Sequence, residues 1–237
     1  MLAVANLVWM KPIGAAFFFI VALLVLRKDA RYSLNQLFAL SFLLFGATQI
    51  FDFLKDVLWS YGYPAIVLSR NISVVTGIVS TGLFLLVGIY VRYGAHQALR
   101  REILIINAIL WIVLSVIAIF DQSISDTPDP VLLTRIYTGL FGMIALFIMT
   151  SVFVIASTIM LFSASRDLTD PKKRRSIQLL ALGMLILVIG AIAYGLEGIF
   201  SSIFSPLDPI LLYITLTGLI AWLIGAILCL LAFRHRF

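Results

Sequence analysis

The chain alternates long apolar stretches with short polar connections that carry most of its charge. A helix that crosses about 30 Å of hydrocarbon needs about 20 mostly apolar residues. These stretches are longer than barrel strands and lack strict alternation, so helices are the structure that satisfies their backbone in lipid. The pattern predicts an all-α integral membrane protein, a single domain over 1–237 formed by a bundle of seven transmembrane helices. The predicted spans are residues 3–26, 35–59, 66–91, 103–120, 132–163, 177–203 and 210–233.

The composition strengthens this interpretation. Hydrophobic residues make up 62% of the 237 and charged residues only 12%, whereas a soluble domain usually carries about 25% charged residues. A soluble fold could not bury this much apolar surface away from water, whereas in a bilayer the same surface contacts lipid. The single cysteine, Cys229, lies in an apolar run, where we interpret it as a small buried hydrophobic residue.

The distribution of lysine and arginine predicts the orientation in the membrane. The predicted spans divide the connections into two alternating sets, and thirteen of the seventeen basic residues fall in one set. Short connections rich in basic residues stay in the cytoplasm. We therefore expect a multi-pass protein of the cell membrane with its N-terminus outside and its C-terminus in the cytoplasm. The thirteen are Arg27, Lys28, Arg31, Arg92, Arg100, Arg101, Arg166, Lys172, Lys173, Arg174, Arg175, Arg234 and Arg236.

The net charge of +6 does not indicate a nucleic-acid partner, because the basic residues lie in short loops between apolar spans. The partners that the sequence predicts are the lipid bilayer and a protein partner in the membrane or the cytoplasm. The basic run Lys172, Lys173, Arg174 and Arg175 is the predicted contact for that partner or for anionic lipid.

A faint internal repeat relates residues 33–64 to residues 177–206 at a constant offset of 142. At this offset Gln36 meets Gln178, and Pro64 meets Pro206. The offset pairs the second span with the sixth and the third with the seventh, which would give two parallel triplets joined by the fourth span. The alternative is that two helix–turn–helix units resemble each other because they meet the same membrane constraints.

Ionisable residues gather at one predicted depth, in the outer third of the membrane. Asp52 and Glu197 each lie about 9 Å below the outer end of their helices. Arg70, Arg135 and Lys11 lie near the outer ends of three further helices. Charges inside a bilayer cost at least ~2.5–3.5 kcal/mol at its centre, and those that occur usually face a cavity or a partner. The arrangement predicts a polar pocket that opens to the outside.

The neighbours of these charges extend the predicted pocket. Gln49 lies three residues before Asp52 and Lys55 three residues after it, roughly on one helix face, and Tyr194 lies three residues before Glu197. An alternative interpretation makes Asp52–Arg70 and Glu197–Arg135 ion pairs that fix helix register. In that interpretation Lys11, Lys55 and Arg135 extend to the membrane interface. Under the first interpretation the ligand-binding candidates are Lys11, Gln49, Asp52, Arg70, Arg135, Tyr194 and Glu197.

Catalytic and cofactor motifs are missing from the sequence. There is no glycine-rich phosphate loop, no HExxH and no CxxC, so we expect neither an enzyme nor a metal site. No lysine lies in the last span, which excludes a retinal Schiff base of the microbial rhodopsin kind. The sequence assigns no cofactor.

The segment from Asp170 to Phe237 has a pattern of its own. It begins with DPKKRRSIQLL, continues through LALGM and YGLEG, and ends with a final span and RHRF. It resembles the N-terminal seven-helix sensor region of prokaryotic histidine kinases, closely over the last quarter and elsewhere only in topology. That resemblance implies signal reception at the outer mouth. Members of that family usually continue into a cytoplasmic output domain. Because the sequence stops at Phe237, we expect either that a sensor of this kind acts through a separate partner or that the chain is truncated.

These observations favour a membrane-embedded sensor or receptor-like module with an outward-facing polar pocket. Two alternatives remain. An accessory or structural subunit of a larger membrane complex fits the short loops and plain helices, and a small-solute transporter fits the possible repeat.

Overall fold

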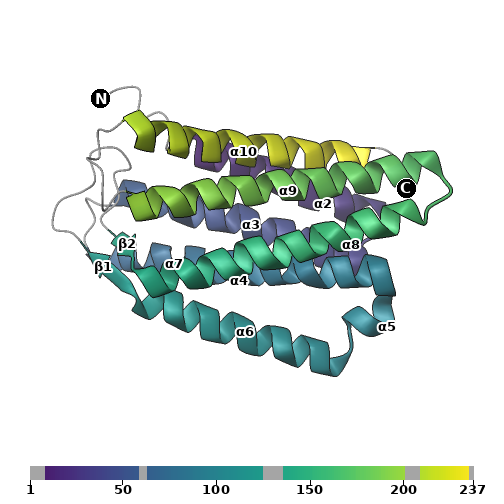
Figure 1. The fold of residues 1–237 in the computed structure, drawn as a ribbon, viewed down its shortest axis with the longest axis horizontal. Helices are drawn as coiled ribbons and strands as arrows, with labels where there is room; N and C mark the ends of the chain where they lie inside the picture. Colours follow the sequence, from purple (N-terminus) through teal and green to yellow (C-terminus); the bar gives the residue numbers. More distant parts are fainter. Residues whose placement is uncertain (1–8, 59–62, 125–135, 201–208, 235–237) are drawn as a thin grey trace.

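The computed structural model describes residues 9–58, 63–124, 136–200 and 209–234. Its long helices lie side by side along one axis (Figure 1). They are α2 (Met10–Lys28), α3 (Ser33–Val57), α4 (Tyr63–Tyr93), α6 (Arg101–Phe120), α9 (Pro171–Phe200), α10 (Pro209–Arg234) and a continuous rod of α7 (Leu140–Phe147), the π-helical segment η2 (Ile148–Phe153) and α8 (Val154–Arg166). The short elements are α5 (Ala95–Ala98), β1 (Gln122–Ile124) and β2 (Ile136–Thr138).

Several of these helices fit a multi-pass membrane protein. By length and composition, five helices in the described part of the chain are suited to cross a bilayer. They are Ser33–Val57, Tyr63–Tyr93, Arg101–Phe120, Leu140–Arg166 and Pro171–Ala193. The first predicted span corresponds to α2, which has 19 residues, and the last to α10, which contains a shorter apolar stretch, Leu216–Ala232.

The predicted start of the fifth span was wrong. The prediction began that helix at residue 132, but residues 136–138 form strand β2, which pairs antiparallel with β1, and the helix begins at Leu140. The apolar run IYT is rich in residues that suit a strand as well as a helix, so hydropathy alone did not separate the two. Asp121 closes the hairpin, because its backbone oxygen accepts from Gly139 N at 2.7 Å and its carboxylate from Gly142 N at 2.7 Å. Residues 125–135 lie outside the described part.

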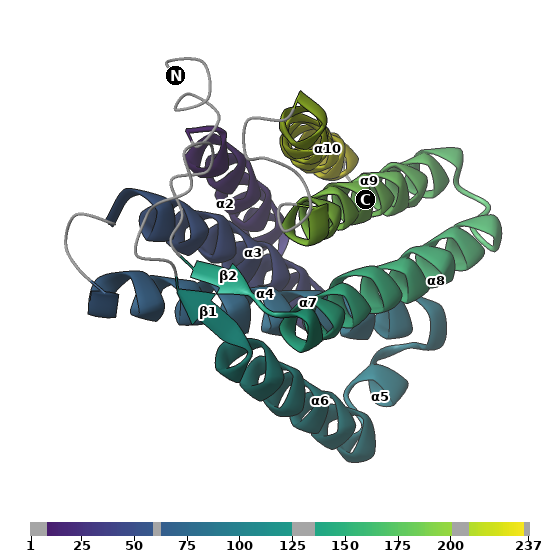
Figure 2. The same cartoon turned by 60° about the vertical axis from the view of Figure 1, so that its left-hand side comes forward.

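Six of the long helices form a closed ring in the order α2, α3, α4, α8, α9, α10 and back to α2, each packed on the next. We call this the helix ring. Helix α6 lies outside it and packs on α4 and α7 (Figure 2). The ring is filled by apolar side chains, among them Phe18, Phe42, Phe84, Leu161 and Met184, all of which are fully buried or nearly so.

Small residues make close contacts between neighbouring helices in two hairpins of the ring, α3–α4 and α9–α10. In α3–α4, the Oγ1 atoms of Thr48 and Thr76 lie 3.0 Å apart. In α9–α10, a Cβ added at Gly190 would lie 3.0 Å from the backbone oxygen of Gly218. The offset of 142 places Thr48 on Gly190 and Thr76 on Gly218, so the two contacts lie at equivalent positions of the predicted repeat. The repeat itself stays a prediction.

Candidate functional site

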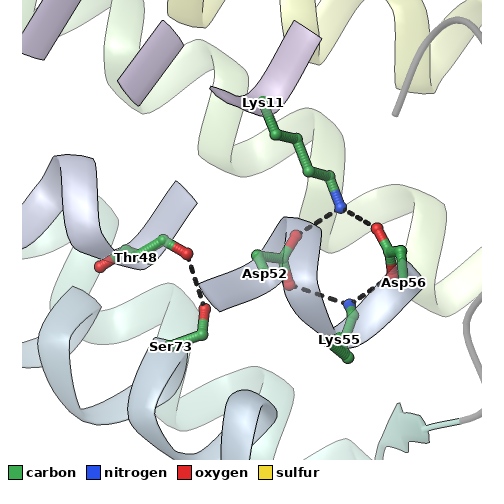
Figure 3. Close-up of polar contacts among 6 residues, drawn as sticks. All are labelled: Lys11, Thr48, Asp52, Lys55, Asp56 and Ser73. Carbon is green, nitrogen blue, oxygen red and sulfur yellow. Dashed lines mark hydrogen bonds and ion pairs between the residues drawn. The ribbon is translucent and has the colours of Figure 1, made fainter. Parts of the chain in front are cut away.

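Four charged side chains meet where α2 begins and α3 ends (Figure 3). The Nζ atom of Lys11 lies 2.5 Å from Oδ2 of Asp52 and 2.5 Å from Oδ2 of Asp56. The Nζ atom of Lys55 lies 2.9 Å from Oδ1 of Asp52 and 3.4 Å from Oδ1 of Asp56. Cations and anions therefore alternate around a closed square. We call these four residues the charge quartet, and the end of the bundle where they lie the quartet end.

The quartet forms because of spacing within α3 and contact with α2. Asp52, Lys55 and Asp56 stand at i, i+3 and i+4, which places them on one face of the last two turns of α3. Lys11 reaches this face from the first turn of α2, which packs along α3. Next to them Trp9 packs on Phe53 with ring centroids 4.9 Å apart. The quartet is thus an ionic link between two neighbouring helices of the ring.

Burial within the quartet is uneven. The side chains of Asp56 and Lys11 are 1% and 4% exposed, that of Lys55 is 12% exposed and that of Asp52 is 20% exposed. Buried charges are costly unless they are paired, and here two cations balance two anions. Asp52 is therefore the most exposed member of the quartet.

Helix α4 brings a further cation to the same end. Arg70 is buried and interacts electrostatically with Asp52. Nearby, Ser73 Oγ donates to the backbone oxygen of Thr48 at 3.1 Å and holds α4 against α3 (Figure 3). Gln49, one turn before the quartet on α3, is also buried. The structure thus brings together four of the predicted site residues, namely Lys11, Gln49, Asp52 and Arg70.

Three predicted site residues fall outside the description. Arg135 lies in the segment 125–135, and the side chains of Tyr194 and Glu197 are likewise not described, although their backbone belongs to the last turns of α9. Helix α9 ends at the quartet end, as Figure 1 shows. The prediction that Tyr194 and Glu197 join the site therefore stays a prediction.

The structure corrects two points about the lysines and acids. The alternative interpretation gave Lys11 and Lys55 no acidic partner, whereas both form ion pairs with Asp52 and Asp56. Asp56 was missing from the predicted site, although it is the most deeply buried member of the quartet. Its position four residues after Asp52 was the available signal, since residues at i and i+4 share a helix face.

The residues predicted to contact a partner lie at the opposite end of the bundle. Lys172, Lys173, Arg174 and Arg175 are exposed in the first turns of α9. Asp170 precedes them, and its carboxylate accepts from Lys172 N at 2.8 Å, which caps the helix. We call this the basic end.

The chemistry available at the quartet is exchange of ionic partners. All four members are held in ion pairs, and among the described residues no group of three or more His, Cys, Asp or Glu side chains is placed to hold a metal ion. A charged solute that pairs with Asp52 or with Lys11 would compete with an ion pair that joins α2 to α3. Comparison of the chain with protein-family models gives no match, and no curated protein matches it in sequence.

Proposed function

We propose that the chain is a sensor module of the cell membrane, with seven spans, an outer N-terminus and a cytoplasmic C-terminus. A charged solute arriving from outside acts at the charge quartet, and the basic end passes the change to a separate protein partner. The observation that carries this proposal is the quartet itself, a set of two cations and two anions in which Lys11 and Asp56 are buried and Asp52 is the most exposed member.

The helix ring supports transmission from one end to the other. Helix α2 packs on α3 and on α10, and α3 packs on α4. A change in the ionic link between α2 and α3 therefore bears on the packing of neighbours that extend to the basic end. There Arg92, in the last turn of α4, pairs with Asp167, which follows α8. This pair lies beside the α8–α9 connection, where the exposed basic run begins.

The resemblance to the sensor region of histidine kinases belongs to the same proposal. In that family the outer mouth receives the signal, which corresponds to the quartet end of this chain. The ligand chemistry proposed here comes from the quartet alone and would stand without the resemblance.

Spin labels at the basic end test the coupling. In a Cys229→Ala background, labels at Ala30→Cys and Thr169→Cys report the distance between the α2–α3 and α8–α9 connections by electron–electron double resonance. The probes are sodium chloride, magnesium chloride, ammonium chloride and sodium phosphate, added in turn outside proteoliposomes. We expect at least one to shift the distance by about 1–2 Å, the usual scale of helix shifts in switching proteins.

Two variants make the result decisive. The charge-balanced pair Lys11→Met with Asp56→Leu removes the link between α2 and α3 and should abolish the shift. Glu102→Gln removes an exposed ion pair to Arg100 at the basic end and should preserve it. A wild-type protein that responds to none of the four salts, or a double variant that responds equally, contradicts the proposal.

A second function is favoured by one observation, the position of α6. Outside the helix ring it presents an apolar surface that includes Ile105, Ile109 and Ile112, all largely exposed. Such a surface suits an accessory subunit that packs in a larger membrane complex. If the chain purifies alone from its native membrane in mild detergent, the accessory-subunit interpretation fails.

A further inference from the structure

Three connections bring basic side chains to the same end of the bundle. The Arg92–Asp167 pair joins the end of α4 to the α8–α9 connection. The hydroxyls of Ser33 and Tyr90 lie 2.9 Å apart and join the α2–α3 connection to the same end of α4. Figure 1 shows α5 and the α8–α9 connection together at the right-hand end. The exposed basic residues of the three connections are Arg27, Lys28, Arg31, Arg100, Arg101, Lys172, Lys173, Arg174 and Arg175.

The acidic residues at this end leave most of that charge unbalanced. Four acids stand there in the described chain against twelve lysines and arginines, Arg234 at the end of α10 included. Asp167 pairs with Arg92, and Glu102 with Arg100 at 2.9 Å. Asp29 and Asp170 accept hydrogen bonds from backbone nitrogens that follow them, at 2.9 Å and 2.8 Å. Each of the four acidic side chains thus pairs with a neighbouring side chain or backbone nitrogen, and this end of the bundle has a strong net positive charge.

Aromatic and apolar side chains stand among these charges. Tyr32 is 47% exposed in the α2–α3 connection, and Tyr93 is 63% exposed at the end of α4. Gly94 then takes a φ of 90°, which turns the chain into α5, and Leu99 follows with 42% exposure. Tyrosine with nearby lysine and arginine is typical of the boundary between hydrocarbon and headgroups. The exposed tyrosines and Leu99 therefore suit a face at this boundary.

The start of α9 adds a further observation. Positive side chains are unfavourable at a helix N-terminus, where the backbone dipole is itself positive. Four consecutive basic residues nevertheless occupy the first turns of α9, with Asp170 as the nearest acid. An external layer of anions would offset this repulsion along the whole run.

We propose that the basic end binds the headgroups of anionic phospholipids and gathers them around the α2–α3, α5–α6 and α8–α9 connections. Helices suited to cross a bilayer end at this face, which places it beside the headgroup layer. The charge extends over three connections rather than forming one compact patch, and it is interleaved with interfacial side chains. These features fit a lipid surface better than an acidic peptide. The inference is independent of the signalling role proposed above.

Boundary-lipid measurements test this inference on the full chain. Spin-labelled phosphatidylglycerol and phosphatidylcholine are compared by electron paramagnetic resonance in vesicles of phosphatidylcholine that contain the protein at 0.15 M salt. We expect the anionic lipid to be enriched at the protein by about threefold or more, given the attraction of each basic residue to an anionic surface. At 1 M salt the preference should largely disappear, because screening shortens the reach of charges to about 3 Å.

Two fourfold variants share the same positions. Lys172→Gln, Lys173→Gln, Arg174→Gln and Arg175→Gln together should remove about half of the enrichment or more. Lys172→Arg, Lys173→Arg, Arg174→Lys and Arg175→Lys keep the charge and should keep the enrichment. Equal association of the two lipids with the wild-type protein overturns the proposal, as does an unchanged preference in the glutamine variant. So does tight binding of polyglutamate without any lipid preference, which would assign the face to an acidic protein.

Discussion

Replacing Gly88 by leucine is expected to destabilise the protein by about 3 kcal/mol, at the upper end of the usual cost of overpacking. Gly88 lies where α4 meets α8, and a Cβ at this position would stand 2.7 Å from the Cα of Ser157. The obstacle is backbone, so the two helices have to separate. Separation also breaks the hydrogen bond from Ser157 Oγ to the backbone oxygen of Phe84, which is 2.7 Å long. The free energy of unfolding is measured by titration with sodium dodecyl sulfate in mixed micelles.

A pair of alanine variants provides the control. A Cβ at Gly14 meets no atom within 4 Å, so Gly14→Ala should be neutral or stabilise α2 by up to about 1 kcal/mol through helix propensity. Gly88→Ala should destabilise despite the same gain in propensity. Equal effects of the two alanine substitutions would show that α4 and α8 do not approach as closely as described.

Replacing Lys11 by methionine is expected to cost about 3 kcal/mol, because breaking a buried ion pair leaves uncompensated charge behind. Methionine keeps much of the length of the side chain while removing the ammonium group. Asp52 and Asp56 would then share Lys55 as the remaining lysine of the quartet. The same detergent titration gives the change in the free energy of unfolding.

A double-mutant cycle shows whether this loss comes from the quartet. Asp56→Leu alone should also destabilise, whereas Lys11→Met with Asp56→Leu leaves the Lys55–Asp52 pair balanced and should lose clearly less than the sum. We expect a coupling energy of about 2 kcal/mol. Glu102→Ala, in an exposed pair that solvent screens, should leave the free energy of unfolding nearly unchanged. Additive effects of the two quartet substitutions would mean that Lys11 and Asp56 do not interact.

Hydropathy was sufficient to predict most of the helices, because lipid demands long apolar segments whatever their neighbours. It failed where a short apolar run has another solution, as in β2, where Ile136 and Tyr137 pair with a strand. Sequence spacing also predicted that Asp52 and Lys55 share a face of α3. It did not indicate that Lys11 would reach both aspartates, because that depends on how α2 packs on α3.

The order of the helices in the ring could not be predicted from the sequence, because it also depends on how the helices pack against one another. Packing of helices in a membrane depends on close approach at small residues, and many glycines in the chain were candidates. Only the structure shows that Gly88 faces Ser157 and that Gly82 makes room for the indole of Trp111. The Gly88–Ser157 contact lies between α4 and α8 of the ring, and the Gly82–Trp111 contact lies between α4 and α6, which packs outside the ring.

The proposed function requires the quartet end and the basic end to lie on opposite sides of the membrane. Its most direct test is labelling of single cysteines with a membrane-impermeant maleimide, in intact cells and after permeabilisation. In a Cys229→Ala background, Ser123→Cys in β1 should be labelled from outside, and Lys173→Cys at the basic end only after permeabilisation. Labelling of Lys173→Cys in intact cells, or of both positions from the same side, would contradict the proposed orientation and remove the charge quartet from the outer face.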